Sequence, residues 1–359
     1  MDTPSKQIYL NTASYGLVAP DTVAAATRLY AGFEHNASIR SEEWRINEEG
    51  RIRNTIASFI GTSAKNVAMV PNFSWAMNGI VQSLKGTEKV LLYTGDYPSL
   101  LEPFRINKFD ITWVDAPDGF NIRMDAVNEA ICRKTVDIVA LSQVQWSSGY
   151  KADLAEIGEL CRQYGVLFIV DGTQAMGALV TDLSALHIDV YAASNYKWMN
   201  AGFGTGVLYV SDSFLEKYPP VGGGHNSYKM SGDKWLYLVS PQSYEPGQPN
   251  MFGLTVLEAA ILHKNELGMA NIERNNLQLA ELFLDKLADV PVKLLGNHTV
   301  ANRSPIIYLV DENGLGDIIK QNYIIVTQRN GFLRVSMHYY NTEEHVIALA
   351  DCIRAYLRK

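Results

Sequence analysis

Between about residues 50 and 210, amphipathic helical patterns alternate with short, wholly apolar runs. The apolar runs include "KVLLY", "DIVALS", "LFIVD" and "VYAAS". A short apolar run between helical patterns is typical of a strand that is buried on both faces, whereas a strand with one wet face would alternate. The pattern therefore predicts an α/β fold with a mostly parallel sheet between layers of helices.

A different pattern begins near residue 257. The helical stretch "NIERNNLQLAELFLDKLADV" is followed by short strand patterns, among them "SPIIYLV" and "FLRVSMH". The last predicted helix follows Asn341 and Thr342, either of which can cap it. We expect a large domain over residues 16–256 and a small α+β domain from residues 1–15 and 257–359. The segment Pro219–Trp235, rich in glycine and polar residues, is predicted to be a loop.

Composition excludes several classes of protein. With 359 residues, 47% hydrophobic and 19% charged, the chain is not disordered and can form two domains. Its net charge of −7 gives no reason to expect nucleic acid or an anionic membrane as a partner. No apolar stretch approaches the ~20 residues of a membrane span. The cysteines are odd in number and widely spaced, which indicates neither a disulfide framework nor a metal site, so we expect a reduced, cytoplasmic protein.

Two ionisable residues follow apolar strands. Asp171 ends "LFIVD", and Lys197 comes shortly after "VYAAS". Ligands gather at the carboxyl ends of parallel strands, and a carboxylate buried there needs a cationic partner. Alone, Asp171 suits a turn or helix cap and Lys197 a surface lysine. Together they are the two groups that pyridoxal 5′-phosphate (PLP) requires: an amine for a Schiff base and a carboxylate that keeps the pyridine nitrogen protonated.

Four motifs occur in a fixed order: "VDGTQAMG", "SNYKWMNAGFGTGVLYV", "YEPGQPN" and "LRVSMHYYNTEEHV", after an opening "YLNTASYG". In them the chain resembles, over nearly its whole length, the class V aminotransferases. These are fold type I PLP enzymes that include cysteine desulfurases, selenocysteine lyases, kynureninases and isopenicillin-epimerase-like proteins. The resemblance implies a large domain with a mostly parallel seven-stranded sheet, a small C-terminal α+β domain, and a homodimer with shared active sites.

The resemblance also implies residues that hold the cofactor. Lys197 matches the Schiff-base lysine, Asp171 the partner of the pyridinium nitrogen, and Gln174 the glutamine near the phenolic oxygen. Ser194 and Tyr196 match phosphate-binding positions, of which the second is often histidine in desulfurases.

Further cofactor contacts come from other segments. Phe73 and Ser74 fall where the family begins a helix that cradles phosphate with its N–H groups, although Phe73 replaces the usual small or hydroxyl residue. Tyr97 matches the residue stacked on the cofactor ring, and Gln248 a residue that reaches the neighbouring subunit's phosphate.

Arg334 matches the arginine that grips the substrate α-carboxylate, a task that suits a planar guanidinium. Asn11 and Ala13, in the opening motif, are expected beside the substrate.

The family's reactions divide at a few positions. Desulfurases carry a nucleophilic cysteine on a loop before the carboxylate-binding arginine, but here "IIVTQRNGFLRVS" is short and has none. Trp146 stands where desulfurases often have Asn and kynureninases an aromatic residue, and Tyr97 replaces a stacking histidine. His225, in "GGGH", suits either a substrate contact or an exposed loop. Persulfide-forming desulfuration is therefore not expected.

A lysine that carries the α-proton suffices for transamination, racemisation or β-elimination. We expect a class V aminotransferase-like enzyme that acts on an α-amino acid. A C–S or C–Se β-lyase, an epimerase and a kynureninase-like hydrolase stay open as alternatives. Outside enzymes, the alternative is a catalytically silent protein of the same fold that only binds PLP.

Overall fold

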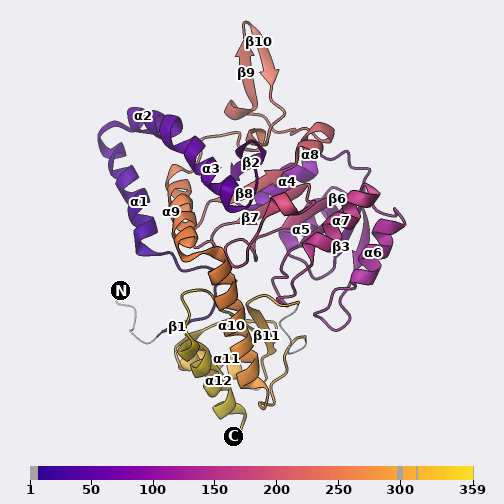
Figure 1. Ribbon diagram of the computed structural model, residues 1–359, viewed down its shortest axis with the longest axis vertical. Helices are drawn as coiled ribbons and strands as arrows, with labels where there is room; N and C mark the ends of the chain where they lie inside the picture. Colours follow the sequence, from indigo (N-terminus) through magenta and orange to yellow (C-terminus); the bar gives the residue numbers. More distant parts are fainter. Residues whose placement is uncertain (1–6, 297–301, 313, 359) are drawn as a thin grey trace.

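The computed structural model describes residues 7–296, 302–312 and 314–358. Its centre is a seven-stranded sheet in the order β2-β8-β7-β6-β5-β3-β4 (Figure 1). Only β8 runs antiparallel to its neighbours, so the predicted mostly parallel sheet is confirmed. The strands are β2 (Val67–Val70), β3 (Lys89–Tyr93), β4 (Asp110–Val114), β5 (Ile138–Ser142), β6 (Leu167–Asp171), β7 (Val190–Ser194) and β8 (Gly206–Val210).

Both faces of this sheet are buried, which explains the apolar runs. In β6, Phe168 and Val170 join one hydrophobic cluster, while Ile169 between them joins another on the opposite face. This alternation follows from the pleat of a strand. The first cluster includes side chains of α3 (Gly50–Phe59), α6 (Met124–Cys132), α7 (Leu154–Tyr164) and α9 (Met251–Leu267), and the second includes those of α4 (Phe73–Ser83), α5 (Pro98–Ile106) and α8 (Asp212–Lys217).

Further helices lie beside this layer. The helix α1 (Pro20–Ala31) packs along α9, and α2 (Phe33–Trp44) leads through a π-helical turn into α3. No helix of the described residues is both long and apolar enough to cross a membrane.

The segment predicted to be a loop contains a β-hairpin, so that prediction is wrong in part. The strands β9 (Tyr228–Ser231) and β10 (Lys234–Tyr237) pair across a two-residue turn and project from the body (Figure 1). Gly232, at the first turn position, has a φ of 60°, the conformation that a tight hairpin turn requires there. Most of the hairpin's side chains are exposed, so no buried face imposed an alternating pattern on the sequence.

The C-terminal residues form a separate core around an antiparallel sheet of β11 (Ile306–Val310), β14 (Phe332–Ser336) and β13 (Thr327–Arg329). The helices α10 (Met269–Leu287), α11 (Leu315–Gln321) and α12 (Glu343–Leu357) complete it, and Thr342 caps α12 through the N–H of His345. The N-terminal strand β1 (Ile8–Tyr9) pairs in parallel with β12 (Ile324–Ile325) of this part. The helix α9 is continuous across residue 257, and the exact domain limits stay a prediction.

Candidate active site

A cavity of about 200 Å³ opens where the adjacent strands β6 and β7 end. Residues from several loops and from the start of α4 meet there because parallel strands end at one edge of the sheet. Eight of the predicted site residues line the cavity together with Trp146. The lining residues are Asn72, Phe73, Ser74, Tyr97, Ser142, Trp146, Asp171, Thr173, Gln174, Ser194, Tyr196 and Lys197.

Asp171 is the last residue of β6, and its carboxyl group is buried. Oδ1 accepts a hydrogen bond from the Thr173 N–H at 2.8 Å, and the Thr173 hydroxyl accepts one from the Ser194 N–H at 3.1 Å. Thr173 thus joins the ends of β6 and β7 while it orients Asp171. Burial raises the pKa of Asp171 to about 7, and the attraction of Lys197 opposes that rise. A carboxyl group in this position is set to bind a cation.

Lys197 lies in the turn after β7, and its amine is almost fully buried. Burial lowers the pKa of Lys197 to about 8, while the nearby Asp171 favours the charged form. Its Nζ lies 5.4 Å from the ring centre of Tyr97 and 5.6 Å from that of Tyr196. Burial therefore brings this amine closer to the neutral form, which is the nucleophilic one.

The first turn of α4 points its N–H groups toward the cavity. The Asn72 side chain caps the helix by accepting from the Trp75 N–H at 2.9 Å, and Ser194 Oγ accepts from the Phe73 N–H at 2.9 Å. The N–H of Ser74, between them, has no carbonyl partner within the helix. Positive helix-dipole charge and a first-turn N–H suit an anionic group such as phosphate. The Phe73 side chain packs in the core, so its contribution is confined to the backbone.

Gln174 lines the cavity, and its side-chain amide also makes two hydrogen bonds to other parts of the protein. Its Nε2 donates to the Ala13 oxygen at 3.1 Å, and its Oε1 accepts from Trp198 Nε1 at 2.7 Å. One hydrogen on Nε2 remains for a ligand oxygen. Ala13 thus lies beside the cavity through Gln174, and its own N–H donates to Ser336 Oγ at 2.9 Å.

Arg334 lies on β14 and is buried, although it is not among the residues that line the cavity itself. Nη1 donates to the Trp146 oxygen and Nη2 to Ser14 Oγ, both at 2.7 Å. Its Nε has no hydrogen-bond partner in the described part of the chain. Desolvation lowers the pKa of Arg334 to about 10. A buried guanidinium with an unused N–H fits a carboxylate ligand.

Asn11 lies close to this arginine. Its Oδ1 accepts from Thr327 Oγ1 at 2.6 Å, and that threonine is the register partner of Arg334 on β13. The structure thus brings Asn11 and Ala13 beside β14, the strand of Arg334, whose guanidinium contacts the Trp146 oxygen. The Trp146 ring meets Tyr97 edge to face, with ring centres 5.8 Å apart.

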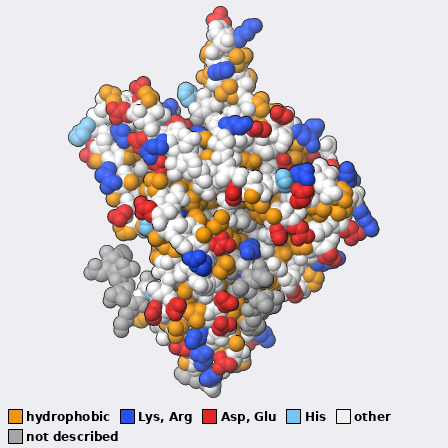
Figure 2. Space-filling model, viewed as in Figure 1, with side chains coloured by type: hydrophobic (Ala, Val, Ile, Leu, Met, Phe, Trp, Pro, Cys, Tyr) orange, Lys and Arg blue, Asp and Glu red, His pale blue; other side chains and the backbone are white. Residues whose placement is uncertain are grey.

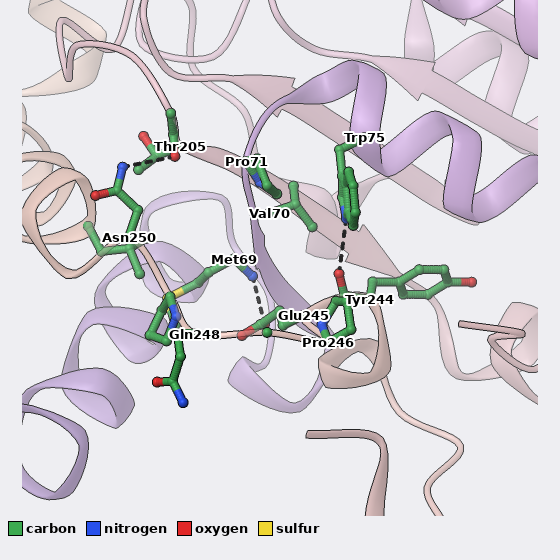
Figure 3. A pocket seen from close by; sticks show the side chains of 14 residues that line it. Met69, Val70, Pro71, Trp75, Thr205, Tyr244, Glu245, Pro246, Gln248 and Asn250 are labelled. Carbon is green, nitrogen blue, oxygen red and sulfur yellow. Dashed lines mark hydrogen bonds between the residues drawn. The ribbon is translucent and has the colours of Figure 1, made fainter. Parts of the chain in front are cut away.

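Gln248 lies outside the Lys197 cavity. It lines a separate hollow of about 260 Å³, which lies between the loop that follows β2 and residues 244–250. Figure 3 shows Gln248 at one side of this hollow and Trp75 at the other, with Trp75 Nε1 bonded to the Tyr244 oxygen at 3.3 Å. A role of Gln248 at a neighbouring subunit stays a prediction. His225 is exposed and lies near Glu49 and Arg53, away from Lys197.

Sequence reasoning missed several polar residues at the cavity. Asp96 is buried next to the cavity residue Ser142, from whose N–H it accepts a hydrogen bond at 2.9 Å, and it also accepts from Gln145 Nε2 at 3.0 Å. Burial raises the pKa of Asp96. Like Asp171, Asp96 follows an apolar strand, and that signal was available in "LLYTGD". Asn72 and Thr173 were also missed.

Comparisons with known proteins identify the family and the fold. Residues 8–349 match the family model described as Aminotransferase class-V. The chain is 23% identical to a probable cysteine desulfurase of Methanothermobacter thermautotrophicus, over 96% of this chain and 94% of that protein. It is also similar to the cystine C–S lyase C-DES in complex with cysteine persulfide, with a TM-score of 0.88 at 21% identity over 98% of both chains.

A second structure of C-DES, a lysine-to-alanine mutant with glycine covalently linked to its PLP cofactor, gives a TM-score of 0.88 at 20% identity. It covers 98% of this chain and 97% of that one. These likenesses establish that the fold is that of fold type I PLP enzymes, as predicted.

Proposed function

The chain belongs to the class V aminotransferase family, whose enzymes depend on PLP, and we propose that it transfers the amino group of an α-amino acid. One observation carries the proposal. A buried lysine and a buried carboxyl group share one cavity, and a buried arginine with an unused N–H lies at its edge. The lysine suits an aldehyde, the carboxyl group a pyridine nitrogen and the arginine a carboxylate.

The residues present fit PLP at both ends. The Asp171 carboxyl can bind the ring nitrogen, and the start of α4, with Ser194, can hold the phosphate. When bound, PLP supplies an aldehyde that condenses with amines and a ring that withdraws electrons from the bonds of the substrate α-carbon. The rings of Tyr97 and Trp146, in edge-to-face contact, line that space.

The other steps belong to side chains of this chain. Arg334 binds the substrate carboxylate through its unused N–H and so orients the α-carbon toward Lys197. Lys197, whose buried amine loses its proton more readily than a surface lysine, takes the proton from the α-carbon and returns it. In transamination the proton is returned to a different carbon. The amine of Lys197 must therefore reach both atoms.

The cysteines argue against a persulfide mechanism. Cys132 ends α6, Cys161 lies in α7 and Cys352 in α12, and none of the three lines the Lys197 cavity. Burial also raises the pKa of Cys161 to about 12, which suppresses its thiolate. A desulfurase that forms a persulfide on the enzyme needs a thiolate at the substrate, so this activity is not proposed.

The second candidate is β-elimination at a C–S or C–Se bond. It is favoured by the similarity to a cystine C–S lyase and to a probable cysteine desulfurase. Removal of the α-proton by Lys197 begins this reaction as well, and elimination needs no enzyme thiolate. Epimerisation and kynureninase-like hydrolysis remain further alternatives.

A homodimer with shared active sites is part of the proposal. The projecting hairpin exposes large apolar side chains, with Trp235 57% and Tyr237 76% exposed, and in Figure 2 it stands clear of the body. Monomeric proteins seldom expose so much apolar surface on one projecting element, so a second subunit is a suitable partner for it. In this dimer we infer that Gln248 contacts the phosphate site of the second subunit. The free state of all three cysteines supports a reducing compartment, the cytoplasm.

Borohydride reduction of the PLP-loaded protein, followed by peptide mapping, tests the cofactor site. We expect a pyridoxyl group on Lys197 and none in Lys197→Ala. An unmodified Lys197 peptide in the PLP-loaded wild type would refute the enzyme proposal and leave the silent binding protein. The second step uses the unreduced holoenzyme and screens it against amino acids with and without keto-acid acceptors. Keto-acid and pyridoxamine phosphate indicate transamination, and sulfide or selenide with pyruvate indicates β-elimination.

A further inference from the structure

A second lysine, Lys264 of α9, is buried close to the Lys197 turn and has no part in the chemistry proposed above. Only 1% of its surface is exposed. Its Nζ donates to Asn200 Oδ1 at 2.9 Å, lies 3.2 Å from His338 Nε2 and lies 4.5 Å from the ring centre of Tyr339. In the described part of the chain no carboxylate pairs with it. A buried lysine without a counter-charge is costly, so its retention needs a reason.

His338 determines how this lysine is bonded. Asn276 Nδ2 donates to the Ala178 oxygen at 3.0 Å, which fixes the orientation of its amide, and it lies 3.3 Å from His338 Nδ1. Nδ1 is therefore the acceptor, and the ring hydrogen is on Nε2. That hydrogen points to the Trp198 oxygen and to Asn200 Oδ1, each 2.9 Å away. Lys264 thus faces a donor, which is compatible with a neutral amine and unfavourable for an ammonium group.

These contacts hold the turn that carries Lys197. Trp198 and Asn200 are the first and third residues after it, and the Asn200 N–H donates to the Lys197 oxygen at 3.1 Å. Asn200 adopts a φ of 60°, which is uncommon for a residue with a side chain. Its side chain is held at both ends, since Nδ2 also donates to the Leu17 oxygen at 2.9 Å. The conformation of the turn is therefore determined by its side-chain partners.

The same cluster reaches the strand that carries Arg334. His338 follows that arginine by four residues and lies two residues after the end of β14. The His338 N–H donates to Asn341 Oδ1 at 2.8 Å, and the ring is wholly buried. A single side chain thus connects the end of β14 with the Lys197 turn, and Lys264 supports that connection from α9.

We propose that Lys264, His338 and Asn200 are positioning residues that fix the turn of Lys197 relative to the strand of Arg334. The inference rests on the proposed function, because in that function Lys197 moves the proton of the α-carbon while Arg334 binds the carboxylate of the same substrate. An apolar side chain at position 264 would fill the same space at lower cost. The polar cluster differs from an apolar side chain because hydrogen bonds are directional. Its hydrogen bonds permit one arrangement of the turn against the strand, and thereby one separation of Lys197 from Arg334.

Lys264→Met tests this by removing the amine and keeping an unbranched side chain of similar length. We expect the melting temperature to stay unchanged or rise. Hydrogen exchange, followed by mass spectrometry, should become faster in peptides covering both 195–204 and 333–339. Turnover should fall roughly 10- to 100-fold, since a small misplacement of reacting groups has effects of this size. A matched core variant, Leu349→Ala in the C-terminal hydrophobic cluster, should lower the melting temperature without accelerating exchange at 195–204.

A double-mutant cycle separates positioning from general damage. Arg334→Lys is measured by kcat/KM in the wild type and in Lys264→Met. If the cluster couples the two segments, the cost of Arg334→Lys is at least about threefold smaller in the Lys264→Met background, because the separation is already lost there. Additive costs with unchanged exchange at 195–204 would overturn the proposal. Should Lys264→Met not fold, Asn200→Gly takes its place, since glycine accepts the positive φ while the acceptor for Lys264 and His338 is removed.

The outcome is distinguishable from failure of the proposed function. Borohydride reduction of the wild type shows independently whether Lys197 carries the cofactor. If Lys197 is labelled, but exchange at 195–204 is unchanged in Lys264→Met and the costs in the cycle are additive, the positioning role alone is refuted. An unlabelled Lys197 would refute the proposed function, and the exchange measurement on the same proteins would still show whether the cluster holds the turn to the strand.

Discussion

Arg334 donates a hydrogen bond of 2.7 Å from Nη1 to the backbone oxygen of Trp146. The bond joins β14 of the C-terminal sheet to the wall of the cavity that contains Lys197. Since the carbonyl takes one N–H of a guanidinium that has five, the bond fixes the plane of the group and leaves other hydrogens for a ligand.

Arg334→Lys is expected to raise KM for the α-amino acid substrate roughly 10- to 100-fold, because an ammonium group cannot bond Trp146 and a carboxylate in one plane. Steady-state kinetics with the best substrate of the screen measures this. Arg329→Lys is the matched control: Arg329 is an exposed arginine on the neighbouring strand β13, with its guanidinium 5.3 Å from the Trp146 ring centre. Equal effects of the two changes would argue against carboxylate binding by Arg334.

Asp171→Asn should change how the stability of the cofactor-free protein depends on pH. Burial raises the pKa of Asp171 from 3.8 to about 7, so between these values the native state binds more protons than the unfolded chain. Wild-type stability contributed by this group therefore falls as the pH rises through that window, and the variant lacks this loss. Melting temperatures of the cofactor-free proteins at pH 5 and pH 8 measure the difference.

The same variant is expected to bind PLP roughly 10- to 100-fold more weakly, because an amide cannot compensate the charge of the ring nitrogen. A spectroscopic titration checks this. Tighter PLP binding by Asp171→Asn than by the wild type would contradict the assigned role.

Lys264→Met should be at least as stable as the wild type near pH 7, because it removes a buried amine that no carboxylate of the described residues pairs with. Burial holds the pKa of Lys264 well below its usual 10.5. At pH values between the lowered pKa and 10.5, the unfolded chain binds the proton and the native state does not. Wild-type stability therefore rises with pH, and the advantage of the variant should shrink toward pH 10. The nearby His338 has its pKa lowered as well, and the phenol of Tyr339 has its pKa raised by burial.

Chemical denaturation at pH 7, 8 and 9 measures this difference. These values lie above the usual pKa of His338, whose contribution is then constant. A difference that does not change over this range would show that Lys264 is protonated in the native state.

The double variant Trp235→Asp/Tyr237→Asp is expected to weaken the proposed dimer, since two charges would be placed in a desolvated contact. Sedimentation velocity over a concentration series should show a dissociation constant that is higher by roughly 100-fold or more. Tyr323→Asp is the control, because Tyr323 is a comparably exposed aromatic residue, at 60%, in the C-terminal part of the chain. A wild type that is monomeric at every concentration would refute the dimer.

The sheet and the meeting of Asp171 and Lys197 in one cavity were accessible to sequence reasoning, because burial on both faces leaves an apolar run and any charge at its end stands out. Asp96 carries the same signal, but its partners Ser142 and Gln145 come from a distant segment, so its burial could not be inferred. Lys264 gave no signal at all. It lies in a helix whose buried positions extend around much of its circumference once α1 and α10 pack against it, and that packing is a property of the tertiary structure.

The pairing of β1 with β12 has a consequence for the order of synthesis. Leu10 and Ala13 are bonded to residues of the last part of the chain: the Leu10 oxygen accepts from the Ser336 N–H, and the Ala13 N–H donates to Ser336 Oγ. During translation the central sheet can therefore form while the first segment waits for its partners, more than three hundred residues later. The contacts around Arg334 therefore form last, and a ribosome-bound chain that lacks β12 and β14 has Lys197 but not the arginine proposed to bind the substrate carboxylate.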